Sequence, residues 1–164
     1  MIKALILDVD GVLTDGGIIY DENGLETKRF DVKDGLGIKL AQHSGIEVVV
    51  ISGRKSKVTE LRCRELGIKR YYTGIKDKTE CYKSLKDELG ITDSETAFMG
   101  DDLNDLKLLK LVGFSATVSD SFDYIKSEVD YVTQKKGGQG AVREFIEQIL
   151  HKNGVWADIQ NSFS

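Results

Sequence analysis

Two aspartates, Asp8 and Asp10, stand one residue apart directly after the apolar run 2–7 and are followed at once by Gly11. The run has the length and composition of a buried strand, so its end aims two negative charges at nearly the same point. Polar groups of complementary chemistry follow three further apolar runs: Ser52, Gly53 and Arg54, then Lys78, then Asp101, Asp102 and Asp105. These groups are the candidates for chemistry.

Carboxylates that converge on one edge of a protein repel each other and lose hydration unless a cation lies among them. Oxygen ligands favour Mg²⁺, which keeps several waters and binds a few carboxylates together with a substrate phosphate. Ser52, Lys78 and the backbone N–H groups near Gly53 offer donors for that phosphate. We therefore expect Asp8 to be the nucleophile and Asp10 the acid and then the base, with Lys78 stabilising charge on the phosphoryl oxygens.

The elements that must position these groups alternate between strand-length apolar runs and stretches of helical periodicity. This alternation predicts an α/β fold with a doubly wound, Rossmann-like parallel sheet covered by helices on both faces. The expected strands are 4–7, 47–51, 70–73, 96–99, 114–117 and 130–132. Ligands of such sheets bind beyond the carboxyl ends of the strands, where the candidate groups lie.

One segment interrupts the alternation. Two short strands, expected at 18–20 and 25–30, flank the sequence Asp-Glu-Asn-Gly at 21–24, which is a strong turn signal for a β-hairpin. The last expected helix follows the Gly-rich segment from Lys135, and the tail 153–164 lacks clear periodicity, so we expect a partly ordered end.

Length and charge limit the possible functions. The chain of 164 residues has the usual size of one domain, and its formal charge of -4 disfavours nucleic acid as a partner. The apolar stretches are too short for a bilayer and the N-terminus lacks a signal-peptide pattern, so we expect no membrane partner and a cytoplasmic location. The two cysteines are isolated in the sequence, and we assign them no chemistry.

The four motifs at the strand ends, DVDGV at Asp8, ISG at Ser52, Lys78 and GDDLND at Gly100, occur in the order typical of one superfamily. Together they resemble the haloacid dehalogenase superfamily of phosphotransferases. The segments VLTDGG (12–17), FDVKDGLGIKL (30–40), SGRKSKVTELRCRELGI (52–68) and GGQGAVREF (137–145) narrow this resemblance. They are similar to the 3-deoxy-D-manno-octulosonate 8-phosphate (KDO 8-P) phosphatases, which are capless members of that superfamily.

The resemblance implies one phosphatase domain over 1–164, with the β-hairpin at 16–31 as a flap after the first strand and 153–164 as a C-terminal tail. It implies a homotetramer in which the flap of one subunit and the tail of another help to close the site. It also implies Mg²⁺ ligation by Asp8, Asp101 and the backbone carbonyl of Asp10. The implied substrate contacts are Asp10, Asp31, Val32, Lys33, Asp34, Gly35, Lys39, Gly53, Arg54, Arg62 and Lys78.

The spacing of two of these residues also indicates a role in binding the substrate. Arg54 and Arg62 are eight positions apart on one predicted helix, so both guanidinium groups can point along one face. A guanidinium binds a sugar-acid carboxylate through two parallel hydrogen bonds.

The activity implied is Mg²⁺-dependent hydrolysis of KDO 8-P to the free sugar acid and phosphate, through an aspartyl-phosphate, in lipopolysaccharide precursor synthesis. One alternative is a phosphatase for a nine-carbon keto-deoxy sugar acid phosphate. Relatives of that kind resemble this chain but carry an acidic residue at the position of Arg54, which favours the eight-carbon substrate. Another alternative is a non-catalytic regulatory module of sugar-nucleotide synthesis, which the intact motifs at all four strand ends disfavour.

Overall fold

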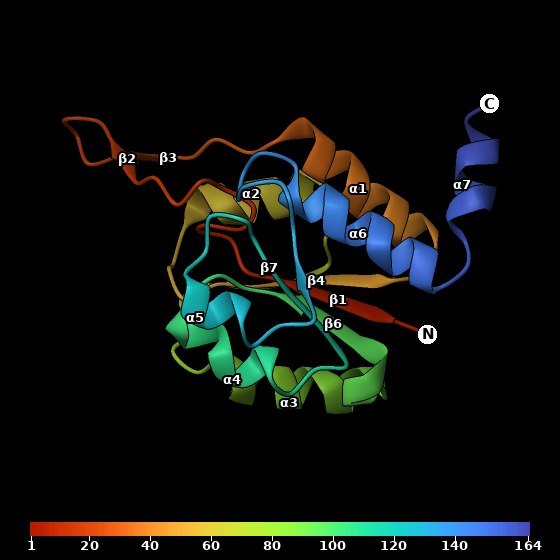
Figure 1. Ribbon diagram of the computed structural model, residues 1–164. Helices are drawn as coiled ribbons and strands as arrows, with labels where there is room; N and C mark the ends of the chain where they lie inside the picture. The colour runs from red at the N-terminus through yellow and green to blue at the C-terminus, as the bar shows by residue number, and fades with distance from the viewer.

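The protein is built around one six-stranded parallel sheet (Figure 1). The computed structural model describes residues 1–164. The strands are β1 (Ala4–Leu7), β4 (Glu47–Ile51), β5 (Arg70–Tyr72), β6 (Thr96–Met99), β7 (Phe114–Thr117) and β8 (Tyr131–Val132). Their order is β5-β4-β1-β6-β7-β8, and every neighbouring pair is parallel. From β1 the chain runs to β4 and β5 on one side, and from β5 it crosses to β6 on the other side of β1, so the strand order reverses at β1 and β6, where ligands of such sheets bind. The expected doubly wound fold is confirmed.

Helices cover both faces of this sheet. They are α1 (Val32–His43), α2 (Lys57–Glu65), α3 (Lys78–Leu89), α4 (Leu106–Leu109), α5 (Asp123–Lys126), α6 (Ala141–Lys152) and α7 (Trp156–Ser162), with short 3₁₀ turns η1 (Asp93–Glu95) and η2 (Leu103–Asp105). In Figure 1, α1 and α6 lie side by side over one face, and α3 and α4 lie under the other. Side chains in N-cap positions begin α1, α2 and α3 by accepting backbone N–H bonds: Asp31, Ser56 and Asp77.

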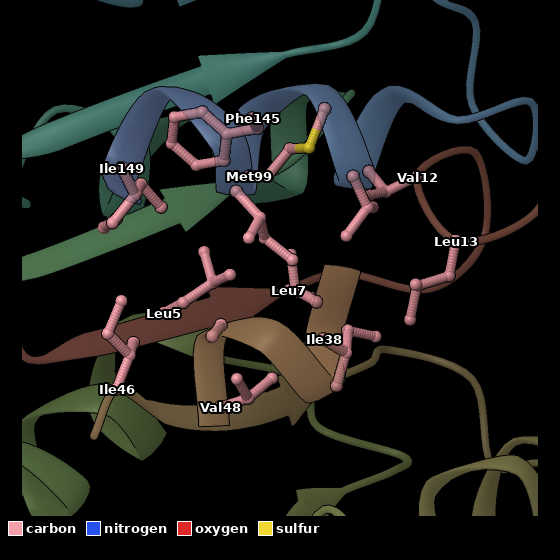
Figure 2. Close-up of a cluster of buried hydrophobic side chains, with 14 of the residues drawn as sticks. Leu5, Leu7, Val12, Leu13, Ile38, Ile46, Val48, Met99, Phe145 and Ile149 are labelled. Atoms are coloured by element: carbon pink, nitrogen blue, oxygen red, sulfur yellow. The ribbon is translucent and has the colours of Figure 1, made fainter. Parts of the chain in front are cut away.

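The core has two parts, one on each side of the sheet, because successive side chains of a strand point to opposite faces. Leu5 and Leu7 of β1 are buried against α1 and α6, near Ile38, Phe145 and Ile149, as Figure 2 shows. Ile6, which lies between them in sequence, belongs to the second cluster, formed with residues of α3 and α4. The centre of the sheet is thus buried on both faces, which fixes the strand ends that carry the polar groups.

The hairpin is shorter than its apolar pattern indicates. Its antiparallel strands are β2 (Ile19–Tyr20) and β3 (Glu26–Thr27), rather than 18–20 and 25–30. The turn is closed by the Asp21 side chain, which accepts the backbone N–H groups of Asn23 and Leu25. The pairing is limited to Ile19 with Thr27 and Tyr20 with Glu26, so the ladder ends at Thr27. The hairpin projects away from the body of the domain (Figure 1) and leaves several apolar side chains exposed.

The C-terminal tail is more regular than expected, since most of it forms α7. The tail is held at its first residue, Asn153, whose side chain accepts the Ile2 N–H and donates to the Ile2 carbonyl, both at 2.8 Å. Ile159 is buried at the edge of the core, and Trp156 packs beside it. Helix α7 has too few apolar side chains to be predicted from the sequence. It gains its stability from tertiary contact. None of the helices combines the length and apolarity that a membrane span needs.

Candidate active site

A polar cleft of about 310 Å³ opens at the carboxyl ends of β1, β4 and β6. Its lining contains no hydrophobic residue: Asp8, Asp10, Ser52, Gly53, Arg54, Asp101, Asp102 and Asn104. The motifs that follow three separate strands therefore meet at one place. Lys78, from the first turn of α3, reaches the same cluster from beneath, with only 3 % of its surface exposed.

Glycines allow the backbone to hold the first aspartates tightly. Gly11 has φ +88°, and a Cβ there would lie 2.0 Å from an oxygen of Asp101. The Gly137–Gly138 turn packs against the same loop, because a Cβ on Gly137 would lie 1.9 Å from the Gly11 carbonyl oxygen. Gly138 N–H donates to the Val12 carbonyl at 3.0 Å. The Gly-rich segment before α6 thus acts as a support for the loop that carries Asp8 and Asp10.

Three carboxylates and one ammonium form a cluster at the cleft, in which Asp8 and Asp101 line the cleft and Asp105 and Lys78 are buried behind it. Carboxylate oxygens of Asp8, Asp101 and Asp105 all lie within 4.8 Å of one another. The Lys78 ammonium lies 2.8 Å from Asp8 Oδ1 and 2.6 Å from Asp105 Oδ1. One buried positive charge therefore faces three carboxylates. A further cation can balance the remaining negative charge.

Asp105 has a structural task in this cluster. Its Oδ1 accepts a hydrogen bond from Lys78, and its Oδ2 accepts the backbone N–H groups of Asp101 and Asp102 at 2.9 and 3.3 Å. Because both oxygens are engaged, Asp105 orients the loop after β6 and the lysine. Asp8 and Asp101 are left as the carboxylates that can bind a metal ion.

The acidity of these two groups fits a metal site. Burial raises the pKa of Asp8 to about 7, helped by the negative charge of Asp105 and opposed by Lys78. Burial, followed by the charges of Asp8 and Asp105, raises the pKa of Asp101 to about 8. Both shifts have the cause expected where a divalent cation is required to balance the charge. An oxygen-only donor set of this kind fits Mg²⁺.

Asp10 lies at the rim of the cleft, where it meets two cations. The Lys28 ammonium, from the stem of the hairpin, pairs directly with Asp10 Oδ1. Arg54 Nε lies 3.8 Å from Asp10 Oδ2. Glu26 lies between the two cations, with its Oε1 at 3.1 Å from Lys28 Nζ and 3.0 Å from Arg54 Nη2. Sequence reasoning missed Lys28 and Glu26, because charges in a short hairpin are normally solvated.

The prediction that Arg54 and Arg62 share one helix is wrong. Ser56 accepts the Thr59 N–H and caps α2, so the helix begins at Lys57 and Arg54 lies in the loop before it. Arg62 is on α2, where its guanidinium lies 5.6 Å from the Phe30 ring centroid. Arg54 alone of the pair lines the cleft.

The candidate substrate residues of α1 and its N-cap lie outside the cleft of their own chain. Asp31 caps the helix by accepting the Lys33 N–H at 2.7 Å, and Gly35 packs against the Arg62 guanidinium. Asp34 is 1 % exposed and accepts the Arg143 N–H at 2.8 Å, so its side chain faces α6. The other three are exposed on the helix surface: Val32, Lys33 and Lys39.

Comparison with known proteins shows the family to which the chain belongs. A family model described as haloacid dehalogenase-like hydrolase matches residues 72–146. The 3-deoxy-D-manno-octulosonate 8-phosphate phosphatase KdsC of Escherichia coli (strain K12) is 45 % identical over 153 residues, which cover 93 % of this chain and 81 % of that protein. The chain belongs to the KDO 8-P phosphatase family of haloacid dehalogenase-like hydrolases.

Solved structures of KDO 8-P phosphatases have the same architecture. The enzyme from Moraxella catarrhalis, in complex with a magnesium ion, a phosphate ion and a KDO molecule, superposes with a TM-score of 0.97 at 42 % identity and covers 99 % of this chain and 94 % of its own. The cobalt-bound phosphatase from Haemophilus influenzae has a TM-score of 0.91 at 43 % identity, covering 94 % of this chain and 91 % of its own. Both family members contain a divalent metal, in agreement with the carboxylate cluster described above.

Proposed function

We propose that this protein is a Mg²⁺-dependent phosphatase that hydrolyses KDO 8-P to the free sugar acid and phosphate, in lipopolysaccharide precursor synthesis. The observation that carries the proposal is the meeting of Asp8, Asp101 and Lys78 in one polar cleft. Asp8, Asp101 and the backbone carbonyl of Asp10 would hold the ion. When bound, Mg²⁺ supplies positive charge that draws the phosphate and the carboxylates together.

The residues of the chain divide the reaction into two steps. An oxygen of Asp8 attacks phosphorus and forms an aspartyl-phosphate while the bond to the sugar oxygen breaks. Asp10 gives a proton to that oxygen, because a sugar alkoxide is a poor leaving group. Asp10 then removes a proton from water, which attacks phosphorus and releases phosphate with Asp8 restored. Lys78, the Ser52 hydroxyl and the Gly53 N–H donate to the phosphoryl oxygens throughout.

Recognition of the sugar acid depends on Arg54. It lines the cleft, and its Nε is buried without a hydrogen-bond partner. A guanidinium in this position can bind the substrate carboxylate with two parallel hydrogen bonds. Arg62 contacts Gly35 and the Phe30 ring, and neither Arg62 nor Gly35 lines the cleft.

We further propose a cytoplasmic homotetramer in which the hairpin acts as a flap on a neighbouring subunit. The hairpin offers exposed apolar side chains to such a contact: Ile18, Ile19, Tyr20 and Leu25. In a tetramer, the exposed Val32, Lys33 and Lys39 would reach a substrate bound in a neighbouring cleft. Native mass spectrometry should then give the mass of four chains, and a monomer at working concentration would contradict this assembly.

A phosphate-release assay over a panel of sugar phosphates tests the proposed function. We expect turnover of KDO 8-P that stops with EDTA and returns with Mg²⁺, and slower turnover of a nine-carbon keto-deoxy acid phosphate. Arg54→Glu should lower kcat/KM for KDO 8-P more than for a phosphate ester without a carboxylate. Preference for the nine-carbon substrate would support the alternative phosphatase, and no turnover of any ester would support the regulatory module.

A further inference from the structure

The stem of the hairpin places one lysine against the proposed acid of the active site. Lys28 follows β3, and its side chain has no exposed surface although it belongs to a projecting hairpin. Its ammonium pairs with Asp10 and lies 3.1 Å from Glu26 Oε1. A lysine fixed in this way, on an element with so few other buried residues, needs an explanation beyond packing.

The contacts of Lys28 form part of a closed arrangement of alternating charge. Glu26 and Lys28 are two positions apart and turn toward the same side, whereas Thr27 and Arg29 are exposed. Glu26 pairs with both Lys28 and Arg54. Arg54 Nε in turn lies 3.8 Å from Asp10 Oδ2. Each carboxylate therefore lies between two cations. Asp10 is held from two directions, and one of them is the hairpin.

We propose that Lys28 is a positioning residue for Asp10, a role that rests on the proposed phosphatase function and adds a further residue to it. Negative charge develops on Asp10 as its proton passes to the oxygen of the departing sugar. The Lys28 ammonium fixes the direction of the Asp10 carboxyl group, which must lie within hydrogen-bond reach of that oxygen. The hairpin thereby contributes to the first chemical step through Lys28, in addition to any contact with substrate.

Two kinds of substrate separate this role from a structural one. A sugar phosphate requires proton transfer from Asp10 when its ester bond breaks, whereas p-nitrophenyl phosphate has a good leaving group and does not. The sugar phosphate used here carries no carboxylate, so that a change in binding by Arg54, which Glu26 joins to Lys28, does not affect the comparison. The ratio of kcat/KM for the two substrates reports the steps up to bond cleavage. It does not change with the fraction of enzyme that is folded, so it stays informative for a destabilised variant.

The experiment compares Lys28→Met, Lys28→Arg and the control Arg29→Met, which alters the exposed neighbour on the same segment. For Lys28→Met we expect kcat/KM for the sugar phosphate without a carboxylate to fall about 10- to 100-fold, which is less than most of the roughly 10²–10⁴-fold that general acid catalysis supplies because Asp10 itself stays in place. We expect kcat/KM for p-nitrophenyl phosphate to fall less than about threefold. Lys28→Arg should restore most of the ratio, and Arg29→Met should leave it unchanged.

Equal losses of kcat/KM on the two substrates would overturn the role of Lys28 and leave only a structural contribution. The same conclusion would follow if Lys28→Met kept the wild-type ratio. A wild-type enzyme that does not hydrolyse KDO 8-P would instead overturn the proposed function. The two failures are thus distinguishable.

Discussion

Replacing Lys78 with methionine tests the charge balance of the cleft. The Lys78 side chain is almost fully buried, and its ammonium lies 2.8 Å from Asp8 and 2.6 Å from Asp105. Methionine keeps most of the apolar stem but leaves two buried carboxylates without their shared cation. Removing one partner of a buried ion pair typically costs about 3–5 kcal/mol. We expect Lys78→Met to lower the free energy of unfolding by that amount at pH 8 with EDTA present.

The cost should depend on pH in a known direction. Burial already raises the pKa of Asp8 to about 7, and loss of Lys78 removes the contact that lowers it, so the pKa rises further in the variant. Below that pKa the carboxyl group is protonated and its burial no longer needs a cation. The destabilisation should therefore be smaller at pH 5.5 than at pH 8, by about 1.4 kcal/mol at most, because pH 8 lies one unit above the wild-type pKa of Asp8.

Urea unfolding followed by circular dichroism, at both pH values and with or without Mg²⁺, measures this effect. Added Mg²⁺ should recover part of the lost stability at pH 8, because it binds only the native cluster. Lys76→Met, at an exposed lysine two residues earlier, is the matched control and should change stability by less than about 0.5 kcal/mol. A Lys78→Met loss below about 1 kcal/mol at pH 8, or one that does not vary with pH, would refute the reasoning.

Three further predictions concern other parts of the molecule. Burial raises the pKa of Asp34 to about 6, so the native state loses stability as pH rises from about 4 to 6. Asp34→Asn should flatten this part of the profile of unfolding free energy against pH, and an unchanged profile would contradict the role of Asp34. Gly137→Ala should lower both the melting temperature and kcat, because its Cβ would lie 1.9 Å from the Gly11 carbonyl oxygen; wild-type values for both would show that the loop is free to move. Mg²⁺ should bind more tightly at pH 8.5 than at pH 6.5 in calorimetry, with release of protons, because the ion needs Asp8 and Asp101 deprotonated; an affinity independent of pH would argue against these ligands.

Much of the fold could be predicted because its central strands are buried on both faces. A continuous apolar run such as Glu47–Ile51 indicates a strand of a covered parallel sheet, and β4 has these bounds. The hairpin strands and α7 were predicted less well. The apolar residues beside the hairpin turn indicated longer strands than the two pairs that form, and α7 gains its regular structure from packing of Ile159 on the core, which local periodicity does not show.

Some residues of the candidate site could be predicted from the sequence and others could not. Asp8, Ser52 and Asp101 could be found because each follows a strand, and the ends of parallel strands meet. Lys28 could not be found, because its role depends on how a short hairpin folds back toward Asp10. Arg54 and Arg62 were expected on one helix, but Ser56 caps α2, so the helix begins at Lys57 and excludes Arg54. The spacing of Asp101 and Asp105 was a usable signal, since a side chain four residues later can accept the backbone N–H groups of a turn.

The central claim is that Asp8 attacks phosphorus, and rapid-quench mass spectrometry tests it most directly. Enzyme mixed with KDO 8-P and Mg²⁺, then quenched in acid during turnover, should carry one phosphoryl group on the peptide that contains Asp8. The Asp8→Asn variant should fold, bind substrate and carry none. A phosphoryl group on another residue, or turnover by Asp8→Asn, would contradict the account.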